Sequence, residues 1–337
     1  MPVTIVDSNA AGLTIEAIRD AHERIRDKIF RTPLLRSELL DDRSGLRLYF
    51  KCENLQQGGA FKARGATNAV YLLSAQEAAR GVLTHSSGNH GAAVARAARL
   101  RGVPAYIVMP DNAPAAKRAA VRRYGGTIEL CEPTLAARER TAREWVQRTG
   151  ATFIHPYDDL RVMAGQGTSA IEMLEEVPDL DAILCPVGGG GNLAGVAVAA
   201  KSIKPTIRVI GVEPAGADDA ARSFRSRRIE PLGQPNTIAD GLRSSLGAKP
   251  FAEILRLVDD IVTVSEASIV KAMRSIWEEL RVVVEPSGAV CYAAILASAS
   301  GLPANARVAL LLTGGNLDLD RLPWQTTAVG PLRNAAV

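Results

Sequence analysis

Short apolar runs alternate with longer segments of helical periodicity along most of the chain. The apolar runs predict buried strands at 46–52, 82–85, 105–109, 127–131, 182–187, 208–213 and 307–312. Segments with apolar residues three or four positions apart predict helices at 15–30, 62–73, 92–100, 113–124, 136–148, 167–176, 193–203 and 266–280. This alternation is typical of βαβ units, so we expect an α/β protein with parallel sheets.

Three loops that follow predicted strands are rich in Gly, Ser, Thr and Asn: 86–91, 188–192 and 313–316. In open parallel sheets, ligands bind beyond the carboxyl ends of the strands. The 337 residues also exceed what one hydrophobic core usually supports. We therefore expect two lobes with a small polar ligand in the cleft between them. A stretch rich in Pro, Gly and Arg, 214–250, is expected to cross the surface.

Composition argues against several other classes of protein. The 40 basic and 36 acidic residues are scattered, so nucleic-acid binding is not indicated. The four cysteines lie far apart without a CxxC pair, which favours neither a zinc knuckle nor disulfides and is typical of reduced thiols in the cytoplasm. No apolar run reaches the roughly 18 residues that a membrane helix needs. We therefore expect a soluble, cytoplasmic protein.

Four consecutive glycines, Gly188, Gly189, Gly190 and Gly191, connect a predicted strand to a predicted helix. Their amides and the helix dipole would converge on one point, which predicts a phosphate site; a simple tight turn needs only one or two glycines. The same residues also satisfy GxGxxA, and Glu213 ends the next strand where a Rossmann fold keeps its ribose carboxylate. A nicotinamide oxidoreductase and a non-catalytic binding module therefore stay open as alternatives.

Lysine is scarce in this chain, with 8 lysines against 32 arginines, and one of them stands in an apolar frame. Lys62 follows Gly58-Gly59-Ala60-Phe61, where burial would lower its pKa and keep the amine nucleophilic. A solvated surface lysine is the alternative interpretation. A nucleophilic amine together with a phosphate cradle suits pyridoxal phosphate, which offers an aldehyde and a phosphate.

Five motifs together resemble the fold type II pyridoxal phosphate enzymes: NLQQGGAFKARGA at 54–66, SSGNHG at 86–91, GGGGN at 188–192, EPSGA at 285–289 and TGGN at 313–316. Within that family the chain resembles serine racemase and the serine, threonine and hydroxyaspartate dehydratases. The resemblance implies two open twisted parallel-sheet lobes with the cofactor in the cleft. It also implies a large cofactor-binding domain of residues 1–75 and 160–337, a small domain of residues 76–159, and a homodimer.

The resemblance implies a role for each residue around the cofactor. Lys62 would form the Schiff base, with Phe61 near the ring and Asn89 on the ring hydroxyl. The phosphate would lie on Gly188 to Asn192, and Glu285 belongs to the same cofactor set. Thr313 would face the pyridine nitrogen, where a hydroxyl cannot drive ring protonation as a carboxylate would. Elimination should therefore prevail over transamination.

The implied reaction is loss of water from a small β-hydroxy-α-amino acid, which gives a 2-oxo acid and ammonia. Lys62 would remove the Cα proton on one face of the ring. Ser87 would lie on the opposite face, as in serine racemase, so racemisation is an alternative outcome; a helix N-cap is the structural alternative for Ser87. The expected substrate contacts are Ser86, Ser87, His90, Arg138 and Ser244.

The substrate itself stays open among L-serine, L-threonine and 3-hydroxyaspartate. A second substrate carboxylate would need another cation, for which Arg138, Arg64 and Arg243 are candidates. Arg138 is equally compatible with a solvated helix face, and His90 with a satisfied histidine in the first turn of a helix.

A divalent cation is the last implication of the resemblance. The stretch 213–219 matches the family's cation loop, with Glu213, the carbonyl of Ala217 and Asp219 as ligands. Oxygen ligands of this kind suit Mg²⁺ or Ca²⁺, with Mn²⁺ as a further option. From the residues alone, the favoured interpretation is Glu213 at a strand end with Asp218 or Asp219 as a helix cap.

Overall fold

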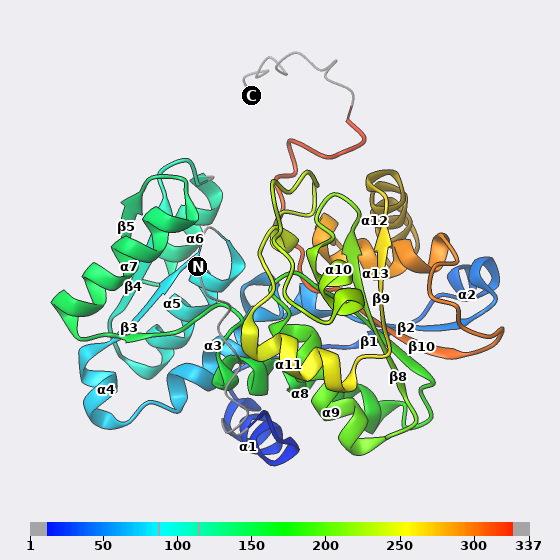
Figure 1. Ribbon diagram of the computed structural model, residues 1–337, viewed down its shortest axis with the longest axis horizontal. Coiled ribbons are helices and arrows are strands. Elements are labelled where there is room, and N and C mark those ends of the chain that lie inside the picture. The colour runs from blue at the N-terminus through cyan, green and yellow to red at the C-terminus, as the bar shows by residue number, and fades with distance from the viewer. Residues whose placement is uncertain (1–11, 87, 114, 326–337) are drawn as a thin grey trace, which may run out of the picture.

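The chain folds into two α/β lobes, each built on a sheet of mainly parallel strands (Figure 1). The computed structural model describes residues 12–86, 88–113 and 115–325. The larger sheet has six strands in the order β1-β2-β10-β7-β8-β9. Their bounds are β1 Leu34–Leu35, β2 Arg47–Lys51, β7 Ala182–Pro186, β8 Arg208–Pro214, β9 Asp260–Val264 and β10 Arg307–Leu311. All neighbouring strands pair in parallel except β1, which pairs antiparallel with β2.

The smaller sheet has four parallel strands in the order β5-β4-β3-β6. Their bounds are β3 Val82–His85, β4 Ala105–Pro110, β5 Thr127–Cys131 and β6 Thr152–Phe153. Strand β3 leads directly into the loop 86–91, and β7 leads into the glycine loop 188–191. Both predicted ligand loops therefore lie at the carboxyl end of a parallel strand, as ligand sites in such sheets do.

Helices cover both faces of the larger sheet, which explains why its central strands are apolar throughout. In β7, Ile183 and Cys185 pack into one core while Ala182 and Leu184 pack into the other. The first core is closed by α1 Ile15–Ile25, α8 Leu160–Glu176, α9 Gly191–Ile203, α10 Asp219–Ser226 and α11 Ala248–Leu257. The second is closed by α2 Glu38–Ser44, α12 Glu266–Leu280 and α13 Pro286–Leu296.

The smaller sheet is covered in the same way. On one face its core includes residues of α3 Lys62–Tyr71, α4 Ala75–Arg80, α5 Asn89–Arg101 and α6 Ala115–Arg123. On the other face Leu83 and Val108 pack against α7 Leu135–Thr149. Short 3-10 helices η1 Glu53–Leu55, η2 Gln57–Gly59 and η3 Asp240–Leu242 lie in the connecting loops. The predicted α/β class with parallel sheets is confirmed.

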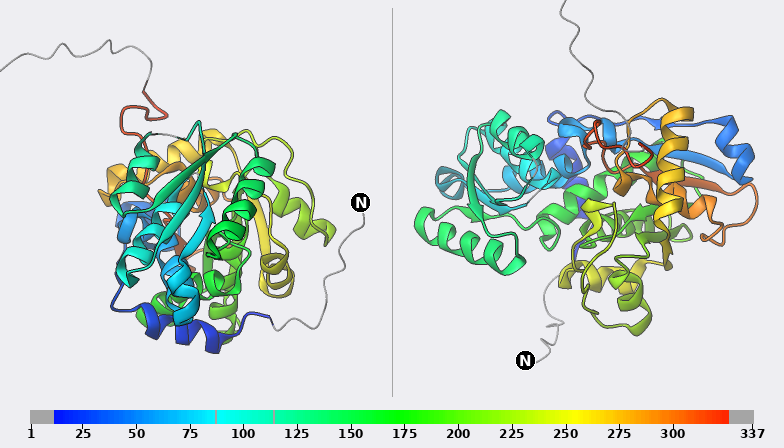
Figure 2. Two further views of the ribbon diagram at one scale, coloured as in Figure 1. Left: turned by 90° about the vertical axis from the view of Figure 1, so that its left-hand side faces the viewer. Right: turned by 90° about the horizontal axis from the view of Figure 1, so that it is seen from above.

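Helices α3 and α8 cross between the two lobes, which lie side by side in Figure 2. At the crossing, a Cβ on Gly165 would lie 2.5 Å from Cα of Gly65, so both positions require glycine. The Gly65 amide also donates a 3.1 Å hydrogen bond to Oε1 of Gln166. Lys62, at the start of α3, is therefore placed by this crossing. The division into domains 1–75 with 160–337 and 76–159 stays a prediction.

Several elements differ from the sequence prediction. Helix α8 begins at Leu160 rather than 167, because the Asp159 carboxylate caps it by accepting the Arg161 amide at 2.9 Å. The first helix ends at Ile25 rather than 30. The predicted surface crossing 214–250 contains α10, and α13 was missed because it is buried on nearly every side and has no amphipathic stripe. In the described residues, no helix is long and apolar enough to cross a membrane.

Candidate active site

Lys62 stands at the first position of α3 with its amine turned into the protein. Nζ donates a 2.8 Å hydrogen bond to the carbonyl oxygen of Pro156 and lies 5.0 Å from the centre of the Phe61 ring. Burial lowers the pKa of the Lys62 amine from 10.5 to about 8. A substantial fraction of the amine is therefore neutral at mildly alkaline pH, as a nucleophile requires.

The loop after β10 holds the segment that carries Lys62. The Phe61 amide donates to the carbonyl oxygen of Thr313 at 3.0 Å, and the Gly315 amide donates to the carbonyl oxygen of Gly59 at 3.0 Å. Ala60 and Gly314 pair between these two bonds as an isolated antiparallel bridge. Two of the predicted motifs, GGAFK and TGGN, thus form a short ladder that brings buried Thr313 beside Phe61.

Close approaches of other residues explain the glycine loop. A Cβ on Gly189 would overlap the Tyr157 ring, one on Gly191 would lie 2.5 Å from the Tyr157 carbonyl oxygen, and one on Gly188 would lie 3.1 Å from Oγ of Ser244. Gly190 has a φ of 86° in the left-handed region. The first backbone N–H groups of a helix lack partners within it, so the start of α9 suits an anion.

Asn192 lies in the first turn of α9 and is buried. Its Nδ2 donates to Sγ of Cys185 at 3.3 Å, while its Oδ1 has no hydrogen-bond partner within the described part of the chain. The side chain is thus turned against β7. Within the predicted phosphate loop, Asn192 is therefore better suited to contribute its backbone amide than its side chain.

Asn89 and Glu285 meet from opposite lobes. Nδ2 of Asn89 donates to Oε1 of Glu285 at 3.1 Å, and its Oδ1 accepts from Nδ2 of Asn316 at 3.0 Å. The Glu285 amide donates to the carbonyl oxygen of Gly314. Burial raises the pKa of the Glu285 carboxyl to about 8, and the charge of Asp240 acts in the same direction. The structure therefore brings Asn89, Glu285 and the TGGN loop together.

The predicted substrate contacts Ser86 and His90 flank the start of α5. Oγ of Ser86 accepts the Gly88 amide at 3.2 Å. His90 is buried with Nε2 3.4 Å from the carbonyl oxygen of Ile154, and burial, together with the charge of Lys62, holds its pKa well below the usual range. His90 is therefore a neutral ring near Lys62. Ser87, the predicted catalytic residue of the opposite face, lies outside the described residues.

Arg138, in the first turn of α7, is partly buried rather than fully exposed to solvent. Its Nε is buried and has no partner among the residues that the structure describes. Burial raises the pKa of the Tyr157 phenol to about 12, while the charge of Arg138 acts in the opposite direction. Burial lowers the pKa of His85 to about 4, with His155 and Arg138 adding to the effect. Arg138 thus faces the same aromatic cluster as these residues.

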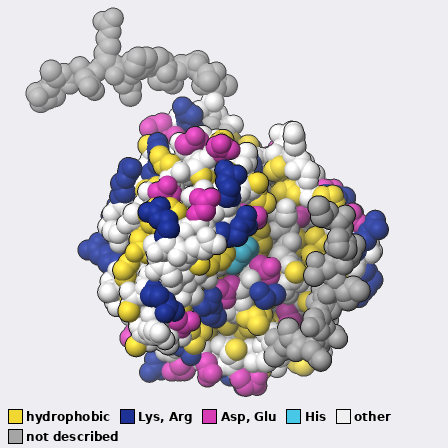
Figure 3. All heavy atoms as spheres, turned by 60° about the vertical axis from the view of Figure 1, so that its left-hand side comes forward, with side chains coloured by type: hydrophobic (Ala, Val, Ile, Leu, Met, Phe, Trp, Pro, Cys, Tyr) yellow, Lys and Arg dark blue, Asp and Glu magenta, His cyan; other side chains and the backbone are white. Residues whose placement is uncertain are grey.

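Sequence reasoning missed that aromatic cluster. The rings of His155 and Tyr157 meet edge to face at 4.6 Å, and His85 meets His155 at 5.9 Å. With Phe153 and residues of α7, His85 and His155 line a cavity of about 450 Å³. The available signal was that three of the four histidines stand in or beside the loops 86–91 and 155–159. On the small-lobe side, basic side chains are interspersed with acidic ones (Figure 3).

The predicted cation loop contains two buried carboxylates. Oε1 of Glu213 accepts the Ala221 amide at 2.7 Å, and Oδ2 of Asp219 accepts the Leu246 amide at 3.1 Å. Burial raises the pKa of Glu213 to about 8 and that of Asp219 to about 6. The third loop carboxylate, Asp218, forms an ion pair with Arg222 instead. Within the described ranges no three His, Cys, Asp or Glu side chains are grouped to hold a metal, so the predicted set depends on the Ala217 carbonyl.

The structure excludes one of the three arginines considered for a second substrate carboxylate. Arg64 is fully buried and its guanidinium is engaged by Glu53, Glu172 and Thr168. Arg243 is turned toward the carbonyl oxygen of Thr237. Sequence alone could not show this, because the partners lie up to 108 positions away. Arg138 and the exposed Arg243 stay candidates.

Comparison with known proteins decides between the two cofactor hypotheses. A model of the family described as pyridoxal-phosphate dependent enzyme matches residues 25–314. The chain belongs to this family. The family match therefore favours pyridoxal phosphate over the dinucleotide that the GxGxxA pattern at the start of α9 had left open, and Glu213 is engaged by the amides of Ala220 and Ala221.

Similar proteins catalyse both elimination and racemisation. Serine racemase of Arabidopsis thaliana is 51% identical over 316 residues, which are 93% of this chain and 95% of that protein. Beta-hydroxyaspartate dehydratase of Paracoccus denitrificans is 49% identical over 311 residues, 92% of this chain and 98% of that protein. The solved structure of T.th. threonine deaminase is 44% identical with a TM-score of 0.86, and the match covers 90% of this chain and 99% of that one. The chain is thus a fold type II pyridoxal phosphate enzyme.

The residues present fit this cofactor. Neighbouring residues pack so closely on the glycine loop that a Cβ at any of its four positions would clash with them, and the loop opens a helix whose first amides suit a phosphate. Lys62 is an amine of lowered pKa for an aldehyde. Phe61 and Thr313 are held together beside Lys62 by the ladder described above, and Asn89 and Glu285 join the same TGGN loop.

Proposed function

We propose that this enzyme eliminates water from a small β-hydroxy-α-amino acid and releases a 2-oxo acid and ammonia. The observation that carries the proposal is the amine of Lys62, which donates to the carbonyl oxygen of Pro156, has no carboxylate partner among the described residues, and has a pKa lowered to about 8 by desolvation. The relatives of this chain include a hydroxyaspartate dehydratase and a threonine deaminase, whose names describe reactions of this class.

The proposed cofactor contacts come from both lobes. Gly188 to Asn192 would hold the phosphate, Asn89 the ring hydroxyl, Phe61 the ring, and Thr313 the ring nitrogen, with Glu285 behind Asn89. When bound, pyridoxal phosphate supplies an aldehyde for the amine and a ring that withdraws electrons from the substrate Cα. The Thr313 hydroxyl is not acidic enough to protonate the ring nitrogen, which favours elimination over transamination.

Lys62 acts as the base in this proposal. Its neutral amine takes the proton from the substrate Cα, and the carbonyl oxygen of Pro156 holds the ammonium that results, since Nζ already donates to it at 2.8 Å. A base with a pKa near the working pH is efficient in both directions of proton transfer. His90, which is neutral and buried nearby, does not compete for that proton.

The substrate carboxylate would be held by Ser86, Ser87, His90 and Ser244, with Arg138 as the cation. Ser244 lies against Gly188 and Ser86 lies at the start of α5, so these contacts approach from the two lobes. The unpartnered Nε of Arg138 supports this role, because a buried guanidinium N–H needs an acceptor. The second carboxylate of a dicarboxylate such as 3-hydroxyaspartate would need a further cation.

We also propose a divalent cation, Mg²⁺, Ca²⁺ or Mn²⁺, at Glu213, the carbonyl of Ala217 and Asp219. Two buried carboxylates with raised pKa values support this, because a hard cation would compensate their charge. We further propose a homodimer in the cytoplasm. Free cysteines in the described residues fit a reducing compartment, and the dimer rests on the family resemblance.

A substrate screen tests the proposed function. L-serine, L-threonine and the 3-hydroxyaspartate isomers are incubated with the enzyme loaded with pyridoxal phosphate, and 2-oxo acid and ammonia are measured. We expect equimolar release of both products from at least one substrate, and none from the Lys62→Ala variant. Oxo acid without ammonia, or activity that persists in Lys62→Ala, would overturn the proposal.

Serine racemisation is a second candidate, favoured by the 51% identity to a serine racemase. Serine recovered from a reaction of L-serine in deuterium oxide distinguishes the two activities. D-serine that carries deuterium at Cα would establish racemisation beside elimination, and its absence under turnover excludes this candidate.

A further inference from the structure

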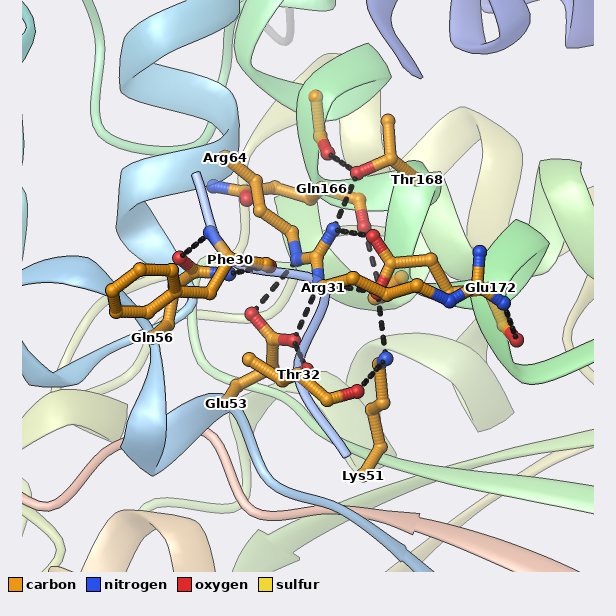
Figure 4. Close-up of polar contacts among 12 residues, drawn as sticks. Phe30, Arg31, Thr32, Lys51, Glu53, Gln56, Arg64, Gln166, Thr168 and Glu172 are labelled. Atoms are coloured by element: carbon orange, nitrogen blue, oxygen red, sulfur yellow. Dashed lines mark hydrogen bonds and ion pairs between the residues drawn. The ribbon is translucent and has the colours of Figure 1, made fainter. Parts of the chain in front are cut away.

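Four charged side chains from α3, α8, β2 and η1 form a closed network (Figure 4). Their side-chain hydrogen bonds reach none of the proposed cofactor contacts. Lys51, Glu53 and Arg64 have no exposed side-chain surface, and Glu172 is 3% exposed. Lys51 donates to Glu172 at 2.6 Å and to the carbonyl oxygen of Thr32 at 2.7 Å. Two cations and two carboxylates are thus buried as one neutral unit.

Arg64 is the centre of this network. Its Nε and Nη2 donate to the two carboxylate oxygens of Glu53 at 2.8 and 2.7 Å. Its Nη1 and Nη2 donate to the two oxygens of Glu172 at 2.7 and 2.8 Å, and Nη1 also donates to Oγ1 of Thr168 at 3.0 Å. All five N–H groups of the planar guanidinium are therefore used, in two bidentate pairs whose geometry no other side chain reproduces.

The network fixes the helix that carries Lys62. Arg64 stands two positions after Lys62 on α3, while Thr168 and Glu172 lie on α8. The residues just before α8 include Pro156, whose carbonyl oxygen accepts the Lys62 amine. The Arg64 fork therefore joins the element that supplies the amine to the element that orients it.

Stability alone does not account for such a unit. Buried ion pairs cost desolvation, and apolar side chains of similar volume are often as stable in their place. The unit is neutral overall, and burial is the cause that lowers the pKa of Lys62. Apolar side chains in these positions would lack directional hydrogen bonds. The glycine contact between Gly65 and Gly165 would then not by itself fix the position of α3 along α8.

We propose that Arg64 is a positioning residue, whose bidentate contacts to Glu53 and Glu172 hold α3 on α8 in the register that aims the Lys62 amine at the cofactor aldehyde. The proposal rests on the proposed function, because it concerns the same lysine. Arg64 lies two positions after Lys62, and in this role it contacts neither the substrate nor the cofactor.

A comparison of the two cations of the network tests the proposal. Arg64→Lys keeps the charge but loses the fork on α3, whereas Lys51→Met removes the cation on β2 and leaves the Arg64 contacts in place. Each cofactor-free variant is titrated with pyridoxal phosphate, and affinity, thermal midpoint and kcat are measured. Since a displacement of about 1 Å costs reactions about 10²-fold, Arg64→Lys should lose at least about tenfold in affinity and kcat. Lys51→Met should stay within about threefold while its thermal midpoint falls.

The pH dependence of the reaction of the amine with the cofactor separates position from charge. In Arg64→Lys the rate should fall at every pH with an unchanged midpoint, because the net charge of the unit is kept. Should either variant fail to fold, Thr168→Val removes one contact of Arg64, and Thr32→Val removes one contact of Glu53 on the far side. The first should then weaken cofactor binding more than the second.

Equal losses of affinity in Arg64→Lys and Lys51→Met, or in Thr168→Val and Thr32→Val, would overturn the positioning role. A shifted pH midpoint in Arg64→Lys would overturn it as well, because it would reveal an electrostatic effect. Failure of the unsubstituted chain to bind pyridoxal phosphate would instead refute the proposed function, so the two failures are distinguishable.

Discussion

Replacing Gly191 by alanine tests the phosphate cradle through sterics alone. Gly191 begins α9, its φ lies outside the left-handed region, and alanine is a good helix former, so the backbone gains no strain from the substitution. The added Cβ would lie 2.5 Å from the carbonyl oxygen of Tyr157 and 2.9 Å from its Cα. These are backbone atoms, which cannot rotate away as a side chain would.

The required displacement follows from these distances. A carbon and a carbonyl oxygen in contact lie about 3.3 to 3.6 Å apart, so the loop and Tyr157 must separate by about 0.8 Å or more. Overpacking of this kind costs roughly 1–3 kcal/mol. If the cofactor-free loop relaxes and the cofactor must draw it back, that cost appears as about a 5- to 150-fold loss of affinity.

The assay is titration of the cofactor-free chain with pyridoxal phosphate, followed by its visible absorbance. The matched control is Gly126→Ala in the small lobe, whose Cβ would lie 2.8 Å from Cγ1 of Val121, away from the glycine loop. Both variants should lose thermal stability, and only Gly191→Ala should lose cofactor affinity. Equal affinities in the two variants would refute the assignment of this loop to the phosphate.

Three further predictions concern ionisable groups. Because burial lowers the pKa of Lys62 to about 8, the rate at which the cofactor-free chain reacts with pyridoxal phosphate should rise with pH and level off above about pH 8. Stopped-flow absorbance measures this rate, and a rise that continues toward pH 10.5 would contradict the prediction. Glu213 and Asp219 have raised pKa values, so the folded chain binds more protons than the unfolded one and loses stability as pH rises from about 4.5 to about 8. Mg²⁺ must displace these protons, so it should raise the thermal midpoint more at pH 8 than at pH 6, and not in Glu213→Gln; the same shift at both pH values argues against the site. Arg138→Gln should raise KM about 10- to 100-fold with little change in kcat. The control Arg140→Gln, on the same helix, should leave KM unchanged. Steady-state kinetics in which both variants raise KM equally would show that Arg138 does not belong to the site.

Periodicity predicted the parallel sheets because their strands are short apolar runs with helices between them. Strand β5 was placed at its observed bounds, and α12 at Glu266–Leu280. The same reasoning missed α13, which is buried on nearly all sides, and began α8 too late because glycines at its crossing with α3 have low helix propensity. Those glycines are explained by a contact between helices and not by local preference.

The sequence predicted those parts of the candidate site that are formed by residues close together in the chain. Lys62, the glycine loop and the TGGN loop are recognisable because each motif is contiguous, and backbone hydrogen bonds join the segment before Lys62 to the TGGN loop. The partners of Arg64 could not be predicted, since Glu53, Thr168 and Glu172 meet it only in the folded chain. The cluster of His85, His155 and Tyr157 escaped for the same reason.

Identifying the amine that holds the cofactor tests the central claim most directly. The enzyme is incubated with pyridoxal phosphate, reduced with borohydride so that the linkage becomes permanent, and digested for peptide mass spectrometry. The structure predicts one modified peptide, which contains Lys62, and none in Lys62→Ala. Modification of another lysine, or of none, in the loaded unsubstituted enzyme would contradict the account.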